Sequence, residues 1–164
     1  MKNRRLAVVA ILLVAVLCVG VGYAALNDTI NATGTIEYDP SFNITWGEIT
    51  NGTATVDNVA GTGTDNLTFT VDTTDWALNE AKTFTIVVNG DSKYGAENIE
   101  VQSLVTTNVD AYYDVSAEVT GDTEIPAGGT TTVTVTITMT AYPLADAEYA
   151  QTFTFSVYAD QVVS

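Results

Sequence analysis

The stretch Thr131–Thr140 reads TTVTVTITMT and alternates between apolar and hydroxyl-bearing side chains with a period of two. Successive side chains of a β-strand point to opposite faces, so the apolar residues share one face and the threonines share the other. Threonine favours extended backbone because its Cβ is branched, and its hydroxyl group tolerates water. The stretch therefore predicts a β-strand with one buried face and one solvated face.

The same alternation recurs along most of the chain. It is clear at Leu67–Val71, Phe84–Val88 and Phe153–Val157, and weaker at Phe42–Glu48, Thr53–Asn58, Asn98–Val105 and Tyr113–Val119. Glycine-rich and asparagine-rich turn sequences separate these runs. About eight or nine strands in about 135 residues predict an all-β fold, a single antiparallel β-sandwich. Asp75–Lys82 has the composition of a short helical turn, with Trp76 as a plug over one end of the core.

The first 24 residues carry the features of an export signal. A basic start is followed by an apolar run, Leu6–Val21, and by small residues up to Ala24. Small residues at that position are what a signal peptidase reads. We therefore expect cleavage after Ala24 and an extracellular or cell-surface location. The expected division of the chain is 1–24 as signal, 25–38 as N-terminal strand and 39–164 as sandwich.

Other interpretations of this segment remain open. The apolar stretch Leu6–Leu26 is long enough to span a bilayer, so an uncleaved signal would anchor the protein in a membrane. Cys18 would be a lipid attachment site, but Leu17 stands before it where such sites have a small residue. A pilin-like helix would need cleavage before the apolar run. Arg5 directly precedes Leu6, however, so no small residue provides a cleavage site there.

The net charge and the residue types that are missing after the signal make several classes of function unlikely. After cleavage two basic and 20 acidic residues remain, a net charge of 2 − 20 = −18, and no arginine, histidine or cysteine is left. Such a surface repels nucleic acid, whose binding requires lysine and arginine. Nucleophilic triads lack a histidine base, and zinc sites lack their usual ligands. Acidic pairs for acid–base hydrolysis arise by chance among 20 carboxylates, so we expect no enzyme, cofactor or small-molecule substrate.

The segment Ala25–Tyr38 is a strand template at the expected N-terminus. The residues assigned to this strand's assembly role are Ala25, Leu26, Ile30, Ala32, Gly34, Ile36 and Tyr38. From Ile30 onward the even-numbered residues share one face and the polar residues share the other. The segment is either the first strand of its own sandwich or a strand donated to the sheet of a second copy.

Strand donation has a geometric consequence. Ten residues of strand span about 33 Å, enough to run the length of a sandwich. An interface that repeats head to tail does not close and generates a filament. Gly34 weakens an ordinary strand but fits a place where two backbones approach closely.

At this point the sequence resembles a family. The signal ending in Gly22–Leu26 and the strand Ile30–Ile36 look like the TasA/camelysin group of secreted matrix proteins, whose signals are SipW-dependent, and the similar archaeal bundling pilins. Further agreement comes from Phe42–Ile49, Ile125–Gly129 and Phe153–Gln161. The resemblance implies a jelly-roll-like sandwich that polymerises by donating its N-terminal strand. Metal-dependent proteolysis, linked to the camelysin branch, is not carried over because the chain has no histidine.

The residues and the resemblance together predict a structural subunit of an extracellular filament, a pilus or biofilm-matrix fibre, whose partner is a copy of itself. One alternative is a monomeric adhesin or carbohydrate-binding sandwich, with Trp46, Trp76 and Tyr112-Tyr113 as stacking groups. A membrane-anchored surface protein and an acid-based hydrolase are the others.

Two kinds of surface site complete the predictions. Five Asn-x-Thr sequons are candidate glycosylation sites, at Asn27, Asn31, Asn43, Asn51 and Asn66. Acidic loop pairs could hold Ca²⁺, but no EF-hand spacing is present, so solvated surface charge is the favoured interpretation.

Overall fold

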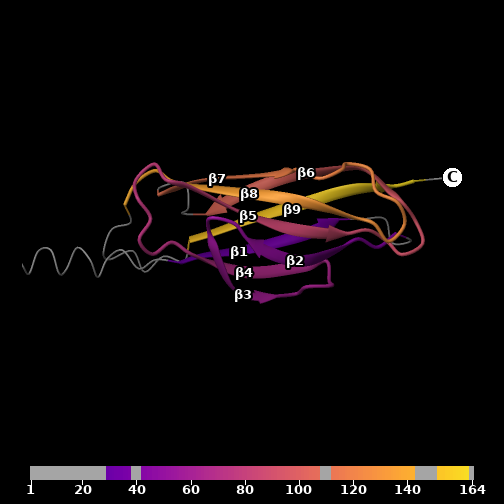
Figure 1. Ribbon diagram of the computed structural model, residues 1–164, viewed down its shortest axis with the longest axis horizontal. Helices are drawn as coiled ribbons and strands as arrows, with labels where there is room; N and C mark the ends of the chain where they lie inside the picture. The colour runs from indigo at the N-terminus through magenta and orange to yellow at the C-terminus, as the bar shows by residue number, and fades with distance from the viewer. Residues whose placement is uncertain (1–28, 38–41, 108–111, 143–150, 163–164) are drawn as a thin grey trace, which may run out of the picture.

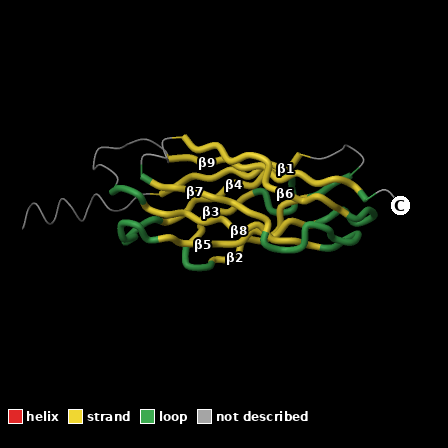
Figure 2. The backbone as a smooth tube through the Cα atoms, turned by 90° about the horizontal axis from the view of Figure 1, so that it is seen from above, coloured by secondary structure: helices red, strands yellow, loops and turns green. Residues whose placement is uncertain are grey.

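The computed structural model of the chain describes residues 29–37, 42–107, 112–142 and 151–162. Within these residues the secondary structure consists of strands, turns and short loops, without a helix (Figure 2). The strands are β1 (Thr29–Glu37), β2 (Thr45–Asn51), β3 (Thr55–Ala60), β4 (Asn66–Asp72), β5 (Ala81–Asn89), β6 (Ala96–Thr107), β7 (Tyr113–Val119), β8 (Thr130–Met139) and β9 (Gln151–Gln161).

The strands form two sheets that pack face to face as a sandwich. The five-stranded sheet has the order β3-β4-β1-β9-β6, and the four-stranded sheet has the order β2-β5-β8-β7. Figure 1 shows both sheets elongated along one direction. The prediction of an all-β sandwich is thus confirmed.

The alternating stretch that predicted the fold lies in β8. Its apolar residues are buried and its threonines are mostly half-buried, in strict alternation over the strand. β8 pairs with β5 on one side and β7 on the other. The single exception to the threonine pattern is Thr131, which is buried.

The prediction that every pair would be antiparallel is wrong for one pair. β1 and β9 run parallel, with Ile30 opposite Gln151 and Glu37 opposite Tyr158. Antiparallel neighbours are often joined by a hairpin, whereas a parallel pair needs a long crossover. The rest of the domain separates β1 from β9, so no turn sequence specifies their relative direction.

The predicted helical turn at Asp75–Lys82 is also wrong. Asp75 and Asn79 have φ angles of 63° and 64°, in the left-handed region, and β5 already begins at Ala81. A right-handed helix does not pass through such residues. Trp76 nevertheless covers one end of the core as predicted: it is 4% exposed, and its ring meets that of Tyr113 edge-on at 6.2 Å.

The core lies between the two sheets and is rich in aromatic residues. Phe69 of the five-stranded sheet meets Phe84 of the opposite sheet edge-on at 5.3 Å, and Phe153 of its own sheet at 6.0 Å. Such edge-to-face pairs add to the free energy of burial.

We name the two ends of the sandwich. The N pole is the end where β1 begins and Trp76 caps the core, and the C pole is the end where β1 and β9 both finish (Figure 1).

Candidate functional site

The strand singled out by the sequence lies in the middle of the five-stranded sheet. β1 pairs antiparallel with β4, from Thr29 opposite Asp72 to Thr35 opposite Asn66, and parallel with β9. Both edges of its backbone are therefore paired, one with β4 and the other with β9. Removal of β1 would leave two unpaired strand edges facing one another, each a template for another strand.

The side chains of β1 divide as the sequence predicts. Ile30, Ala32 and Ile36 are 0%, 2% and 6% exposed, whereas Asn31 on the opposite face is exposed. The neighbouring strands present six apolar residues to the same core layer. We call the space that they frame the β1 groove; it is flanked by Leu67, Phe69 and Val71 of β4 and by Phe153, Phe155 and Val157 of β9.

Gly34 lies against side-chain rings, whereas the sequence suggested a close approach of two backbones. A Cβ atom at this position would lie 3.0 Å from Cζ2 and 3.2 Å from Cε2 of Trp46, and 3.4 Å from Cζ of Phe155. The indole ring of Trp46 in turn meets the Phe155 ring edge-on at 5.3 Å. The absence of a side chain at Gly34 thus makes room for the ring of Trp46, which belongs to the opposite sheet.

Local backbone contacts hold Trp46 in place. The register of β2 against β5 shifts between Trp46 and Ile49, which marks a β-bulge. The backbone N–H of Trp46 donates to the carbonyl of Thr64 at 2.9 Å, and its carbonyl accepts from the N–H of Gly63 at 2.6 Å. The indole Nε1–H is buried without a hydrogen-bond partner among the described residues. An unpaired buried donor costs about 1–3 kcal/mol, so shape and not hydrogen bonding places this ring.

The segment that follows β1 is fastened at the C pole. Phe42 is fully buried, and the N–H of Asn43 donates to Oδ2 of Asp91 at 3.0 Å. The same carboxylate accepts from the N–H of Lys93 at 2.6 Å. These contacts fix the chain from Phe42 onward independently of β1, and only residues 38–41 separate the two.

Several predicted residues lie outside the described part of the chain. They are the cleavage site Ala24, the assembly residues Ala25, Leu26 and Tyr38, and the sequon residue Asn27. No helix within the described residues is long and apolar enough to cross a membrane. The four other sequon residues, Asn31, Asn43, Asn51 and Asn66, are all exposed.

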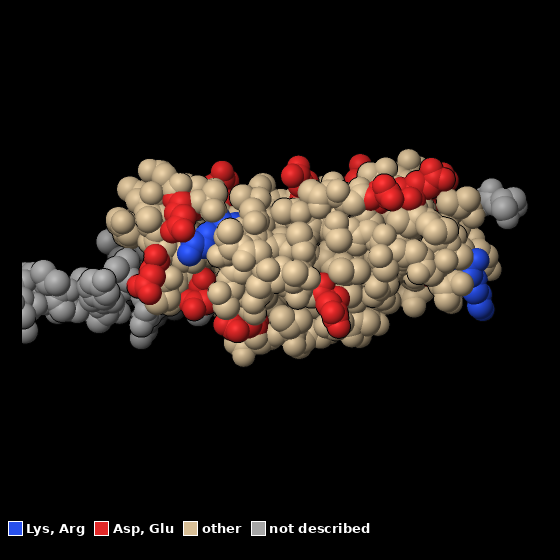
Figure 3. Space-filling model, viewed as in Figure 1, with Lys and Arg blue, Asp and Glu red and all other residues tan. Residues whose placement is uncertain are grey.

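Surface charge matches the acidic composition. Figure 3 shows acidic atoms spread over one face and basic atoms at two places. One ion pair joins Nζ of Lys82 to Oε1 of Glu80 at 3.5 Å, on the surface. Within the described ranges no group of three carboxylate, histidine or cysteine side chains could hold a metal ion, so the suggested calcium sites find no support there.

Acid is expected to destabilise the fold through carboxylates that cap loops. Hydrogen bonds from the hydroxyl and the N–H of Thr74 lower the pKa of Asp72, and the N–H of Lys93 lowers the pKa of Asp91. A lowered folded-state pKa contributes stability above pH about 4, which is lost as the pH falls through the lowered value. We expect the Tm from circular dichroism to fall as the pH is lowered from 5 to 3. Asp91→Asn should reduce that slope; an unchanged slope would contradict the assignment.

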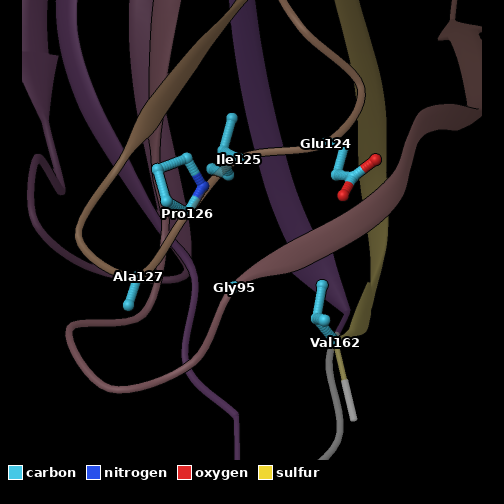
Figure 4. Close-up of a pocket in the computed structure, with 6 residues that line it drawn as sticks. All are labelled: Gly95, Glu124, Ile125, Pro126, Ala127 and Val162. Atoms are coloured by element: carbon cyan, nitrogen blue, oxygen red, sulfur yellow. The ribbon is translucent and has the colours of Figure 1, made fainter. Parts of the chain in front are cut away.

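Two hollows on the surface are each lined by a single carboxylate residue, Glu124 in one and Glu48 in the other. One of about 430 Å³ lies at the C pole and is lined by Gly95, Glu124, Ile125, Pro126, Ala127 and Val162 (Figure 4). Ile125 is buried and its backbone bonds that of Ala96, so the hollow is a seam between loops. The other, of similar volume, adjoins the β2 bulge at Gly47. Neither is lined by a residue of β1 or β4.

The aromatic residues proposed for sugar stacking are inside the protein. Trp46, Trp76 and Tyr113 are buried, and Tyr112 is half-buried. A carbohydrate ring cannot stack on a side chain that the core covers. The alternative of a sugar-binding module therefore loses the residues on which it rested.

Comparison with known proteins adds no identification. No protein-family model matches the chain, and neither a curated protein sequence nor a solved structure was found to match it. The resemblance to the TasA/camelysin group stays a prediction from sequence pattern. The functional argument therefore depends on the β1 groove.

Proposed function

We propose that this protein is a structural subunit of an extracellular filament, assembled when β1 of one copy occupies the β1 groove of the next. The observation that carries the proposal is the place of β1, which is the first of the described strands in chain order and yet is central in its sheet. It is joined to the fastened segment at Phe42 through four residues, 38–41. Such a strand can leave its groove while the other strands keep their pairings.

Exchange of the strand preserves most of the free energy of its contacts. Burial of Ile30 and Ile36 contributes about 1.5–3 kcal/mol each, and each backbone hydrogen bond of the ladder contributes about 1 kcal/mol. These contributions are available in the groove of the same copy or in that of another. Exchange of an identical element is therefore a low-cost route to assembly, and protein concentration decides its extent.

The remaining parts of the proposal follow from sequence and charge. The sandwich is jelly-roll-like, as the resemblance implies, and the partner is a second copy of the chain. The protein is not an enzyme, takes no cofactor or small-molecule substrate and does not bind nucleic acid. Its net charge of 2 − 20 = −18 after Ala24 supports the last point.

The secreted protein provides the direct test. Mass spectrometry of purified material is expected to give Ala25 as its first residue, and electron microscopy is expected to show fibres. An intact Met1 would indicate an anchored protein, and a start near Leu6 would indicate a pilin-like helix. Processed protein that stays monomeric at high concentration would contradict the proposal.

A further inference from the structure

The connection between β1 and the rest of the chain limits how copies can exchange the strand. Glu37 ends β1, and the next described residue, Phe42, is buried at the C pole. Four residues separate them. The distance from Glu37 to Phe42 therefore cannot exceed about 18 Å in an extended chain.

This limit excludes one arrangement. If a donated β1 kept its observed direction, parallel to β9, its Glu37 would lie at the C pole of the acceptor. The two C poles would then lie within about 18 Å of one another, which permits a closed reciprocal pair or copies side by side. Copies stacked along the long axis would need the connection to span at least the length of β1, about 30 Å.

We infer that β1 enters the groove of the next copy in the reversed direction, antiparallel to β9 and parallel to β4, so that the filament runs along the long axis of the sandwich. The inference rests on the proposed function. A strand leaving the C pole of one copy extends away with its N-terminal end leading. It therefore enters the N pole of a copy stacked in the same orientation, and the short connection suffices.

The sequence of β1 is nearly symmetric about its centre, Thr33. A half-turn about the sheet normal at Thr33 reverses the strand and keeps every side chain on its face. That rotation exchanges Ile30 with Ile36, so both ends of the groove still receive an isoleucine. On the outer face it exchanges Asn31 with Thr35.

The centre of the core face is where the symmetry fails. Reversal places Gly34 in the site of Ala32, and Ala32 in the site of Gly34, where a Cβ would lie 3.0 Å from the Trp46 ring. Contacts at that distance require the ring to shift. The natural strand therefore fits its own groove better than a neighbour's, and the reversed insertion forms only when copies are concentrated.

Interchange of these two residues tests the inference without a change in composition. The double variant Ala32→Gly/Gly34→Ala puts glycine under Trp46 in the reversed direction and alanine there in the observed direction. We expect fibres to form at a concentration about tenfold lower than for the natural chain, with a less stable monomer. A double variant that needs an equal or higher concentration would overturn the reversed direction.

Disulfide cross-links test the direction of the inserted β1 strand independently. In the observed direction Asn31 lies opposite Thr70, and in the reversed direction it takes the place of Thr35 opposite Asn66. Chains with Asn31→Cys are mixed with chains carrying Asn66→Cys or Thr70→Cys, all in a Cys18→Ser background. Opposed strand positions lie within the reach of a disulfide.

We expect links between chains for residues 31 and 66, detected as dimers on non-reducing gels of the fibres. Links between residues 31 and 70 of different chains would overturn the direction and leave strand exchange intact. Protein that remains monomeric and forms neither link would overturn the proposed function itself. Single-cysteine chains alone serve as the control for chance oxidation.

Discussion

A chain shortened to begin at residue 38 is expected to lose its folded structure and to regain it when a peptide of sequence Thr29–Glu37 is added. The shortened chain lacks the central strand of its larger sheet, with Ile30 and Ile36 gone from the core and two strand edges unpaired. The lost burial of the two isoleucines costs about 3–6 kcal/mol and the lost ladder hydrogen bonds add to it, which together is comparable with the whole stability of a domain. Thermal unfolding followed by circular dichroism measures the loss, and titration with the peptide measures the recovery.

Fluorescence of Trp46 gives a second readout, because its ring lies against Gly34 in the filled groove. A peptide with Ile30→Asp should not restore the fold, whereas a peptide with Asn31→Asp should restore it. A shortened chain whose Tm stays within a few degrees of the natural one would show that β1 is dispensable to the sandwich. The exchange mechanism would then lose its energetic basis.

The alternation of side chains predicted most strands and both faces of β1. In β8 the alternation of apolar residues and threonines predicts which side chains are buried, because a period of two follows from the geometry of a single strand. The same alternation predicts that Ile30 is buried and that Asn31 is exposed. The local pattern was therefore sufficient to predict the all-β sandwich and the apolar face of the candidate site.

The features that were missed depend on residues far apart in sequence. The direction of β1 against β9 is set by the path of the whole domain, and Gly34 lies against Trp46 of β2, a strand of the opposite sheet. Periodicity does not report such contacts, since each involves an element that the pattern treats separately. The left-handed backbone at Asp75 and Asn79 is a local feature, and it was missed because the composition of the segment is one that helices tolerate.

A single carboxylate in the core face of β1 is expected to abolish donation while sparing acceptance. Ile30 is fully buried opposite Val71, so Ile30→Asp would place a charge in an apolar groove at a cost above about 4 kcal/mol. The adjacent variant Asn31→Asp introduces the same residue, aspartate, on the exposed face of β1 and should alter assembly little. Electron microscopy of each variant alone is expected to show no fibres for the first and normal fibres for the second.

Mixing distinguishes a donor defect from general misfolding. A chain with Ile30→Asp still carries the residues of β4 and β9 that frame the groove, so it can receive a strand from a natural copy but cannot pass one on. Added to natural protein at about one part in ten, it is expected to end growing filaments and shorten them, because each head-to-tail polymer requires every copy to both donate and accept. Fibres of natural length, with the variant left in solution, would show that its groove is not an acceptor and would contradict exchange through this strand.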